Sequence, residues 1–462
     1  MSCTSNITSG FVDLATFDEL EKYLYGGSSA TAYFVRETRK ATWFTQVPVV
    51  LSRSTGNADF GSDHSVNISR AGDYLLQAWL RVNLPSVELA SGNQYSTNGR
   101  LRWTRNLMHN LISECCITFN DLVAARFDNY HLDFWAAFTV PAGKLNGYKN
   151  MIGDFDDLTA PHASGDAIPA YTLNLPLPFF FARDSGVALP TAALPYNEMR
   201  ITYSFRDWTE LLIVDNLAAP ANTNPSRPAT SADLVNGAPQ LGQVQTWANY
   251  AIVSNDERKR MACAPRNILI EQCQTAPLQT FAPGNGGNAN PSYDLRFSHA
   301  IKVMFFAVRN TSVASQWSNY TSATPVPGSS AVDFSPSGAV DPVATTTLTY
   351  ENTARLQLMG SDYFSLVQPW YHAPVIPLDT GYHMYSYSLD FVCLDPKGST
   401  NYGKLTNVSI APNASTGAVT GANGQGLIDS GADFAQTFRF ITTVINNNII
   451  RISGGALGFP VL

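Results

Sequence analysis

The chain has 462 residues, which is enough for two or three domains with cores of their own. Charged residues make up only 14% of it and the net charge is −7. These values exclude a protein that coats nucleic acid, because neutralising phosphates needs a surplus of Lys and Arg. With so few charges, much of the surface is expected to face other protein.

Neither a membrane span nor a secretory leader is expected. The longest apolar runs, at 176–182 and 303–308, fall well short of the ~20 residues that a bilayer-spanning helix needs. The first residues lack both a basic start and an apolar stretch. We therefore expect a protein made in the cytosol, with its six cysteines reduced: Cys3, Cys115, Cys116, Cys263, Cys273 and Cys393.

Strand-like segments with alternating apolar residues recur along the whole chain. They lie at 31–37, 42–51, 73–84, 197–205, 267–273, 301–308, 382–392 and 438–445. In the apolar strand-like run LISECCITFND at 111–121, alternation should send Cys115 and Cys116 to opposite faces. Loops rich in Gly, Pro, Ser and Asn separate the strands, and long helical periodicity is missing. This pattern is typical of β-sandwiches.

Composition also predicts the domain boundaries. We expect an N-terminal arm at 1–30 with a short capped helix, a first sandwich at 31–216, a low-complexity linker at 217–246, and a second sandwich at 247–462. A further low-complexity stretch at 411–433 is predicted to be a long exposed loop.

The two halves have the character of diverged copies of one design. Capping boxes are predicted at Thr16–Glu19 and at Ser254–Glu257, each opening a short helix ahead of a strand. Further along, AWLRVN at 78–83 resembles FFAVRN at 305–310, and ITYSF at 201–205 resembles MYSYSL at 384–389. Their common order favours internal duplication over chance likeness.

No catalytic or metal site is predicted. The seven histidines are dispersed and are interpreted as strand and loop residues with local hydrogen bonds: His64, His109, His131, His162, His299, His372 and His383. Asp154, Asp156 and Asp157 offer a carboxylate cluster for Ca²⁺ or for acid–base work, but a solvated turn is favoured. Six glycosylation sequons, at Asn6, Asn67, Asn310, Asn319, Asn407 and Asn413, are attributed to loop composition.

Long strings of the chain resemble the major capsid proteins of iridoviruses and, more distantly, the double jelly-roll capsid proteins of other nucleocytoplasmic large DNA viruses. The likeness runs from about residue 10 to the C-terminal end. It rests on GFVDLATFDELEKYLYGG, LMHNLISECCITFNDLVAARFDNYHLDFW, LNLPLPFFFARDSGVALPTAALPYNEMRI, NDERKRMACAPRNILIEQCQ and MGSDYFSLVQPWYH. The departures are confined to loops, notably those at 217–243 and 411–433.

The resemblance implies an all-β fold of two tandem eight-stranded jelly rolls, with short helices in loops. It implies that three chains form a near-hexagonal capsomer, that minor capsid and penton proteins join the capsomers, and that the shell encloses an inner membrane, which the protein meets indirectly. We therefore expect a structural protein of the virion, assembled in the host cytoplasm, with no enzymatic activity, no cofactor, no metal and no nucleic-acid partner.

Certain residues then have expected structural roles. Pro176, Pro178, Pro190 and Pro195 should mark strand edges and turns, and Gly398 and Gly403 should permit a tight turn. The closing residues 458–462 should dock on a sandwich or on a neighbouring subunit.

Two other functions stay open from the residues alone. A lectin-like β-sandwich would also suit the jelly-roll pattern and the aromatic content. A glycoside hydrolase on a β scaffold is disfavoured, because no carboxylate pair is identifiable.

Overall fold

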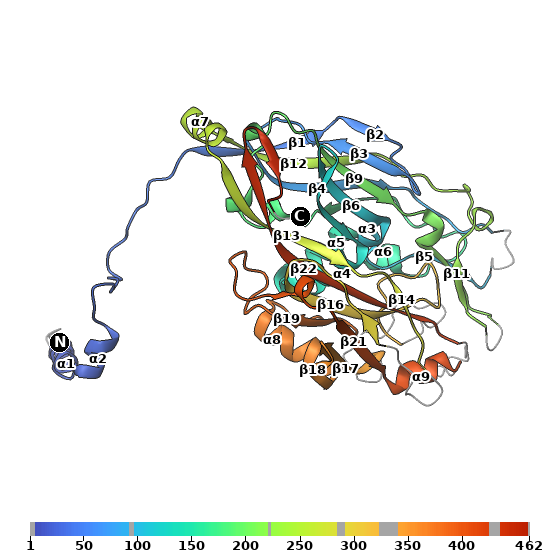
Figure 1. Ribbon diagram of the computed structural model, residues 1–462. Coiled ribbons are helices and arrows are strands. Elements are labelled where there is room, and N and C mark those ends of the chain that lie inside the picture. Colours follow the sequence, from blue (N-terminus) through green and yellow to red (C-terminus); the bar gives the residue numbers. More distant parts are fainter. Residues whose placement is uncertain are drawn as a thin grey trace. The chain divides into compact units, whose positions relative to one another are not determined.

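The computed structural model describes residues 5–91, 97–219, 223–283, 292–322, 341–424 and 435–460, and it divides into the units Met1–Trp43 and Phe44–Leu462 (Figure 1). The N-terminal unit contains the helices α1 (Ser5–Ala15) and α2 (Glu19–Leu24). Residues 31–37 form no strand, so that prediction is wrong. A strand needs a paired neighbour, and none of the described residues of this unit pairs with that segment.

The predicted capping boxes are also wrong, although both helices exist. The cap of α2 is Asp18, which accepts from the backbone N–H of Glu21 at 3.2 Å, while the Thr16 hydroxyl donates to the Asp13 carbonyl. Ser254 caps α7 (Asn255–Cys263) without a side-chain hydrogen bond.

The second unit repeats one strand order. Its first half contains β1 (Phe44–Leu51), β3 (Asp63–Asn67), β4 (Tyr74–Leu84), β6 (Ile112–Phe119), β7 (Leu122–Asp128), β8 (Tyr171–Pro176), β9 (Met199–Phe205) and β12 (Val244–Val253). Its second half contains β13 (Arg266–Thr275), β15 (Tyr293–Asp294), β16 (Ala300–Asn310), β17 (Val343–Tyr350), β18 (Thr353–Gly360), β19 (His383–Ser386), β21 (Val408–Ala414) and β22 (Phe438–Ser453).

Numbered one to eight along the chain, these strands make a sheet with the order 1-8-3-6 and a second sheet with the order 2-7-4-5 in each half. The 1-8-3-6 sheets are β1-β12-β4-β8 and β13-β22-β16-β19, and the 2-7-4-5 sheets are β3-β9-β6-β7 and β15-β21-β17-β18. This order confirms the predicted pair of eight-stranded jelly rolls and the predicted all-β class.

Smaller elements complete the two halves. The first half adds β2 (Ser54–Gly56), a small sheet of β5 (Gly99–Trp103), β10 (Leu212–Asn216) and β11 (Ser226–Pro228), and the helices α3 (Leu107–Leu111), α4 (Asn129–Thr139), α5 (Ala142–Ile152) and α6 (Asp156–Thr159). The second half adds β14 (Gln279–Phe281), β20 (Thr400–Asn401), β23 (Ala456–Gly458), the π-helix η6 (Tyr363–Val367), α8 (Gln368–His372) and α9 (Thr416–Ala422). None of the helices in the described ranges is long and apolar enough to cross a bilayer.

Two matching turns support the internal repeat, which the predicted capping boxes do not. Strands four and five of each half are joined by two consecutive residues with positive φ, Asn120-Asp121 in the first half and Glu351-Asn352 in the second. Two such residues are what a type I′ hairpin requires.

The low-complexity stretches are more structured than expected. The predicted boundary at 246/247 falls within β12, where Trp247 pairs with Trp79 of β4. Upstream of it, β11 pairs with β10, and the buried Asp233 accepts from Arg227 at 2.7 Å. The predicted loop at 411–433 begins as the end of β21 and continues as α9, and its last nine residues lie outside the described ranges.

Two apolar cores fill the unit, and β16 belongs to both of them. Val303, Phe305 and Ala307 join the core shared with the first half, whereas Met304, Phe306 and Val308 face the core inside the second half. Successive residues of a strand point to opposite faces. Burial on both faces therefore explains the unbroken apolar run at 303–308.

Candidate functional site: a buried seam between the two halves

Helix α4 forms the centre of the seam, which is the contact region between the two jelly rolls (Figure 1). It begins after Asp128, whose carboxylate accepts from the backbone N–H of His131 at 2.9 Å. Phe134 and Phe138 then stack on Phe305 of β16, with ring centroids 5.6 and 5.3 Å apart. The helix connects strands five and six of the first half and packs on the outer face of the 1-8-3-6 sheet of the second half.

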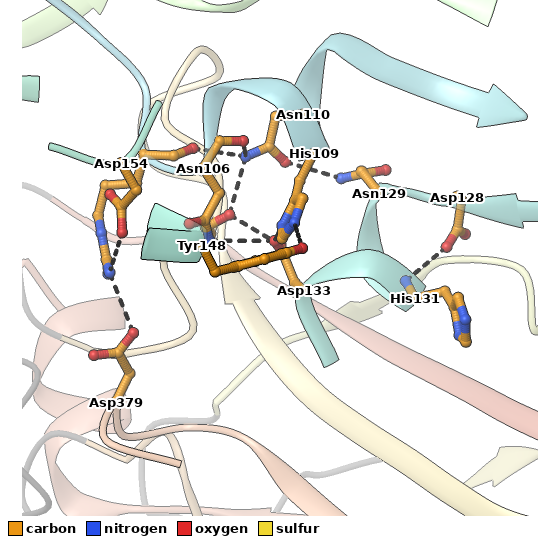
Figure 2. A network of polar contacts seen from close by, with 12 residues as sticks. Asn106, His109, Asn110, Asp128, Asn129, His131, Asp133, Tyr148, Asp154 and Asp379 are labelled. Carbon is orange, nitrogen blue, oxygen red and sulfur yellow. Dashed lines mark hydrogen bonds and ion pairs between the residues drawn. The ribbon is translucent and has the colours of Figure 1, made fainter. Parts of the chain in front are cut away.

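A fully buried carboxylate, Asp133 of α4, organises the polar part of the seam (Figure 2). It lies 2.8 Å from Nδ1 of His109 and accepts from the hydroxyls of Ser318 and Tyr320 at 2.9 and 2.8 Å. The amide of Asn106 adds a fourth contact at 3.3 Å. Burying a carboxylate is costly unless its oxygens are satisfied, and these donors come from both halves.

His109 extends this network toward the outside of the first half. Its Nε2 lies 2.5 Å from the hydroxyl of Tyr148 on α5. Burial, together with the nearby Asp133 charge, raises the pKa of Tyr148 above its usual range. The tyrosine therefore stays a neutral partner.

Arg105 makes a second link across the seam, between Asp154 and Asp379, which are both labelled in Figure 2. Its guanidinium lies 3.5 Å from Asp154 in the first half and 3.2 Å from Asp379 in the second. Burial alone would lower the pKa of Arg105, but the two carboxylates outweigh it and the pKa is raised. The Arg105 cation therefore bridges two carboxylates, one from each jelly roll.

The segment 311–322 of the second half supplies an aromatic contact in the seam. Trp317 lies between two guanidinium groups, with Arg206 3.8 Å and Arg309 3.5 Å from its ring centroid. Its backbone N–H donates to Thr104 at 2.9 Å, and its indole N–H donates to the carbonyl of Glu210 at 2.8 Å. Cation–π stacking on both faces of the ring holds this segment against the first half.

The acidic cluster is only partly the solvated turn that we predicted. Asp156 and Asp157 are exposed, but the Asp154 side chain is only 7% exposed and pairs with Arg105. The difference arises because Asp154 follows Gly153, the C-cap of α5, and the end of this helix packs on the seam. No group of three or more metal-ligating side chains occurs in the described part of the chain.

The histidine prediction needs a similar correction. His109 and His131 lie on helices α3 and α4 rather than on strands or loops, and His383 on β19 pairs with Asp341 at 2.8 Å. Sequence reasoning missed Asp133, Arg105 and Tyr320. Asp133 carried a signal, as a charged residue in the apolar run LDFWAAF, whereas Arg105 and Tyr320 lie in polar stretches that carried none.

The cysteines lie as strand alternation predicts. Cys115 is buried and Cys116 is half-buried on the other face of β6. Five cysteines fall in the described ranges, and all five are free thiols, while Cys3 lies outside those ranges. The sequons at Asn310 and Asn319 are buried, and the side chain of Asn6 lies outside the described part.

Of the predicted turn glycines, Gly398 has φ +121, and a Cβ there would lie 2.7 Å from the carbonyl of Tyr387. Gly403 has no positive φ and lies in a short 3-10 turn. At the C-terminal end, β23 pairs with β22 and Phe459 packs on the first core, while residues 461–462 are outside the described part.

The prolines lie at strand ends and turns. Pro176 ends the edge strand β8, Pro178 precedes a 3-10 turn at Phe180–Ala182, and Pro190 and Pro195 flank another at Thr191–Ala193.

Comparison with known proteins places each half in a known family. Residues 32–253 match a family model described as the major capsid protein N-terminus. Residues 257–458 match one described as the large eukaryotic DNA virus major capsid protein. These ranges contain the two sets of eight strands.

Whole-chain relatives agree with the family models. The chain is 64% identical to the major capsid protein of Costelytra zealandica iridescent virus, with 99% of each chain covered. It is 63% identical to that of Invertebrate iridescent virus 6, again with 99% of each covered. It is 52% identical to that of Lymphocystis disease virus 1, also with 99% of each covered.

Solved structures agree on the fold. A quasi-atomic model of the PBCV-1 virus capsid matches with a TM-score of 0.74 at 19% identity, covering 93% of this chain and 100% of that one. The Faustovirus major capsid protein matches with a TM-score of 0.70 at 13% identity, covering 92% and 93%. The lectin alternative has no support in these comparisons. The chain belongs to the major capsid protein family of large eukaryotic DNA viruses, with close relatives among the iridoviruses.

Proposed function

We propose that three copies of this capsid protein form a capsomer with a near-hexagonal outline that tiles an icosahedral shell. The seam is the observation that carries this proposal. Arg105, Asp133 and Trp317 hold two similar jelly rolls as one rigid pair, and three such pairs present six similar edges. A flexible tandem of domains would not keep these edges in register.

The same proposal assigns the remaining roles. Along the chain, the first jelly roll ends at Val253, the last residue of β12, and the second begins at Ser254, the cap of α7. Minor capsid and penton proteins join the capsomers, the shell surrounds an inner membrane without direct insertion of this chain, and assembly takes place in the host cytoplasm. The protein acts as a structural component without catalysis, cofactor or nucleic-acid partner, consistent with its net charge of −7.

Light scattering of the purified full chain, followed by electron microscopy, tests the assembly. A stable trimer that forms hexagonal arrays is the expected result. A protein that stays monomeric at all concentrations, or that assembles with another copy number, would overturn the proposal.

A further inference from the structure

An apolar surface on the second half has no partner among the described residues of the unit Phe44–Leu462. It is formed by η6, α8 and two neighbouring loops, and its exposed side chains are Leu366 (41%), Trp370 (69%), Tyr371 (73%), Leu378 (66%) and Leu389 (73%). We call it the α8 surface. Its parts adjoin, since Leu366 and Pro377 line one pocket of about 410 Å³, and His372 Nδ1 lies 3.1 Å from the Leu389 carbonyl.

The extent of the α8 surface is that of an interface. Taking about 150–250 Å² for each large side chain, these exposed fractions amount to roughly 500–800 Å². That lies at or above the upper end of the ~300–600 Å² of the largest apolar patch on a typical monomer, and it approaches the ~800 Å² that one partner buries in a standard interface.

A second surface, which no described residue of the unit Phe44–Leu462 covers, lies on the first half, on the outer face of its 1-8-3-6 sheet. Trp79 of β4 and Trp247 of β12 stack there with ring centroids 6.2 Å apart. Beside them is a pocket of about 550 Å³, lined mainly by Ala78, Trp79, Met151, Pro176, Leu177 and Ala182. We call this the tryptophan face.

The internal repeat relates these two surfaces to the two sides of the seam. Helix α4 connects strands five and six of the first half, and η6 with α8 connects strands five and six of the second half. Helix α4 packs on strand three, β16, in the outer face of the second half's 1-8-3-6 sheet. The tryptophan face is the same face of the first half, on strands three and eight.

The two equivalent third strands, β16 and β4, differ in burial, as expected if only β16 is covered within the chain. Strand β16 is buried on both faces, because α4 covers its outer side. In β4, Gln77 and Arg81 of the outer side are exposed and Trp79 is half-buried. Within one chain, α4 of the first half therefore covers the sheet of the second half. The equivalent contact, from the second half to the sheet of a first half, is not made within the chain.

We propose that the α8 surface of one copy docks on the tryptophan face of the next copy, repeating between subunits the contact that α4 makes within each chain. This inference rests on the proposed trimer and names its interface. Such a head-to-tail contact closes into a ring when successive steps are alike. Three copies then supply six similar steps, alternately within and between chains.

Alanine substitutions test the energetics of this contact. Trp370→Ala with Tyr371→Ala, and separately Trp79→Ala, should each raise the concentration at which trimers dissociate by at least about 30-fold in the full chain. Combining them should add little, because both remove one contact. Tyr196→Ala, which truncates an aromatic side chain of 75% exposure elsewhere on the first half, is the matched control and should dissociate like the unmodified protein.

Cross-linking tests the same contact without depending on stability. Tyr371→Cys combined with Gln77→Cys, treated with a short bismaleimide, should give covalent dimers and trimers on a denaturing gel. Each single variant, and Tyr371→Cys combined with Tyr196→Cys, should give only the background from the native thiols.

The outcomes separate the inference from the proposed function. Trimers that form with unchanged affinity in the α8 variants, and no cross-link above background, overturn this interface but leave the trimer standing. An unmodified protein that never forms trimers overturns both. Weakened trimers together with a specific cross-link support the inference.

Discussion

Replacing Asp133 with Asn is the sharpest test of the seam. The substitution keeps the shape of the side chain but removes its charge and turns one acceptor oxygen into a donor group. His109 Nδ1 and the hydroxyls of Ser318 and Tyr320 all lie within 2.9 Å of this carboxylate. The Asp133 side chain is fully buried, so water cannot replace the lost acceptor.

The expected cost follows from the donors left without an acceptor. An unsatisfied buried polar group costs about 1–3 kcal/mol, and removing one member of a buried charged network costs about 3–5 kcal/mol. Each carboxylate oxygen contacts two donors, so Asp133→Asn keeps two of them on the remaining oxygen and leaves the other two facing an NH₂ group. We therefore expect the substitution to lower the free energy of unfolding by about 3–5 kcal/mol.

Chemical denaturation followed by tryptophan fluorescence measures this change, since Trp317 lies in the seam. Asp156→Asn is the matched control, because Asp156 is exposed and surface substitutions usually stay within about 0.5 kcal/mol. If Asp133→Asn unfolds within about 1 kcal/mol of the unmodified protein, the network does not hold the two jelly rolls together.

Three further predictions follow from other parts of the chain. Burial, and then the charge of Arg183, lower the pKa of His131 from 6.5 to about 3. Only the unfolded chain then gains a proton at this histidine as the pH falls below 6.5. The free energy of unfolding should therefore drop by about 2 kcal/mol between pH 7 and pH 5. Chemical denaturation at the two pH values should show a clearly smaller drop for His131→Phe. Gly398→Val should reduce the yield of trimer in light scattering, because φ is +121 and the new Cβ would lie 2.7 Å from the Tyr387 carbonyl. Gly403→Ala, at a residue without positive φ, should give a higher yield of trimer than Gly398→Val. All six cysteines should react as free thiols in denaturing, non-reducing titration, and intact disulfides in the mass spectrum would contradict the expected cytosolic origin.

The strands and the fold class could be predicted from the sequence, because side-chain alternation and turn residues are local signals. The runs at 42–51, 73–84, 111–121 and 438–445 contain or form part of β1, β4, β6 and β22. Family likeness in long strings added the double jelly roll and the capsid role. The segment 31–37 carried the same local signal but forms no strand, because pairing is a property of the partner as well.

Only the tertiary structure decided which polar residues matter. Asp133, Arg105 and Tyr320 are distant in sequence, and their value lies in donors and acceptors that the fold brings within about 3 Å of one another. The same holds for Asp154, which resembles its neighbours Asp156 and Asp157 in sequence but differs from them in burial. Local sequence determines the elements because backbone geometry has a short period. Burial and pairing depend on residues hundreds of positions apart, so the seam and the two uncovered surfaces appear only once the chain is folded.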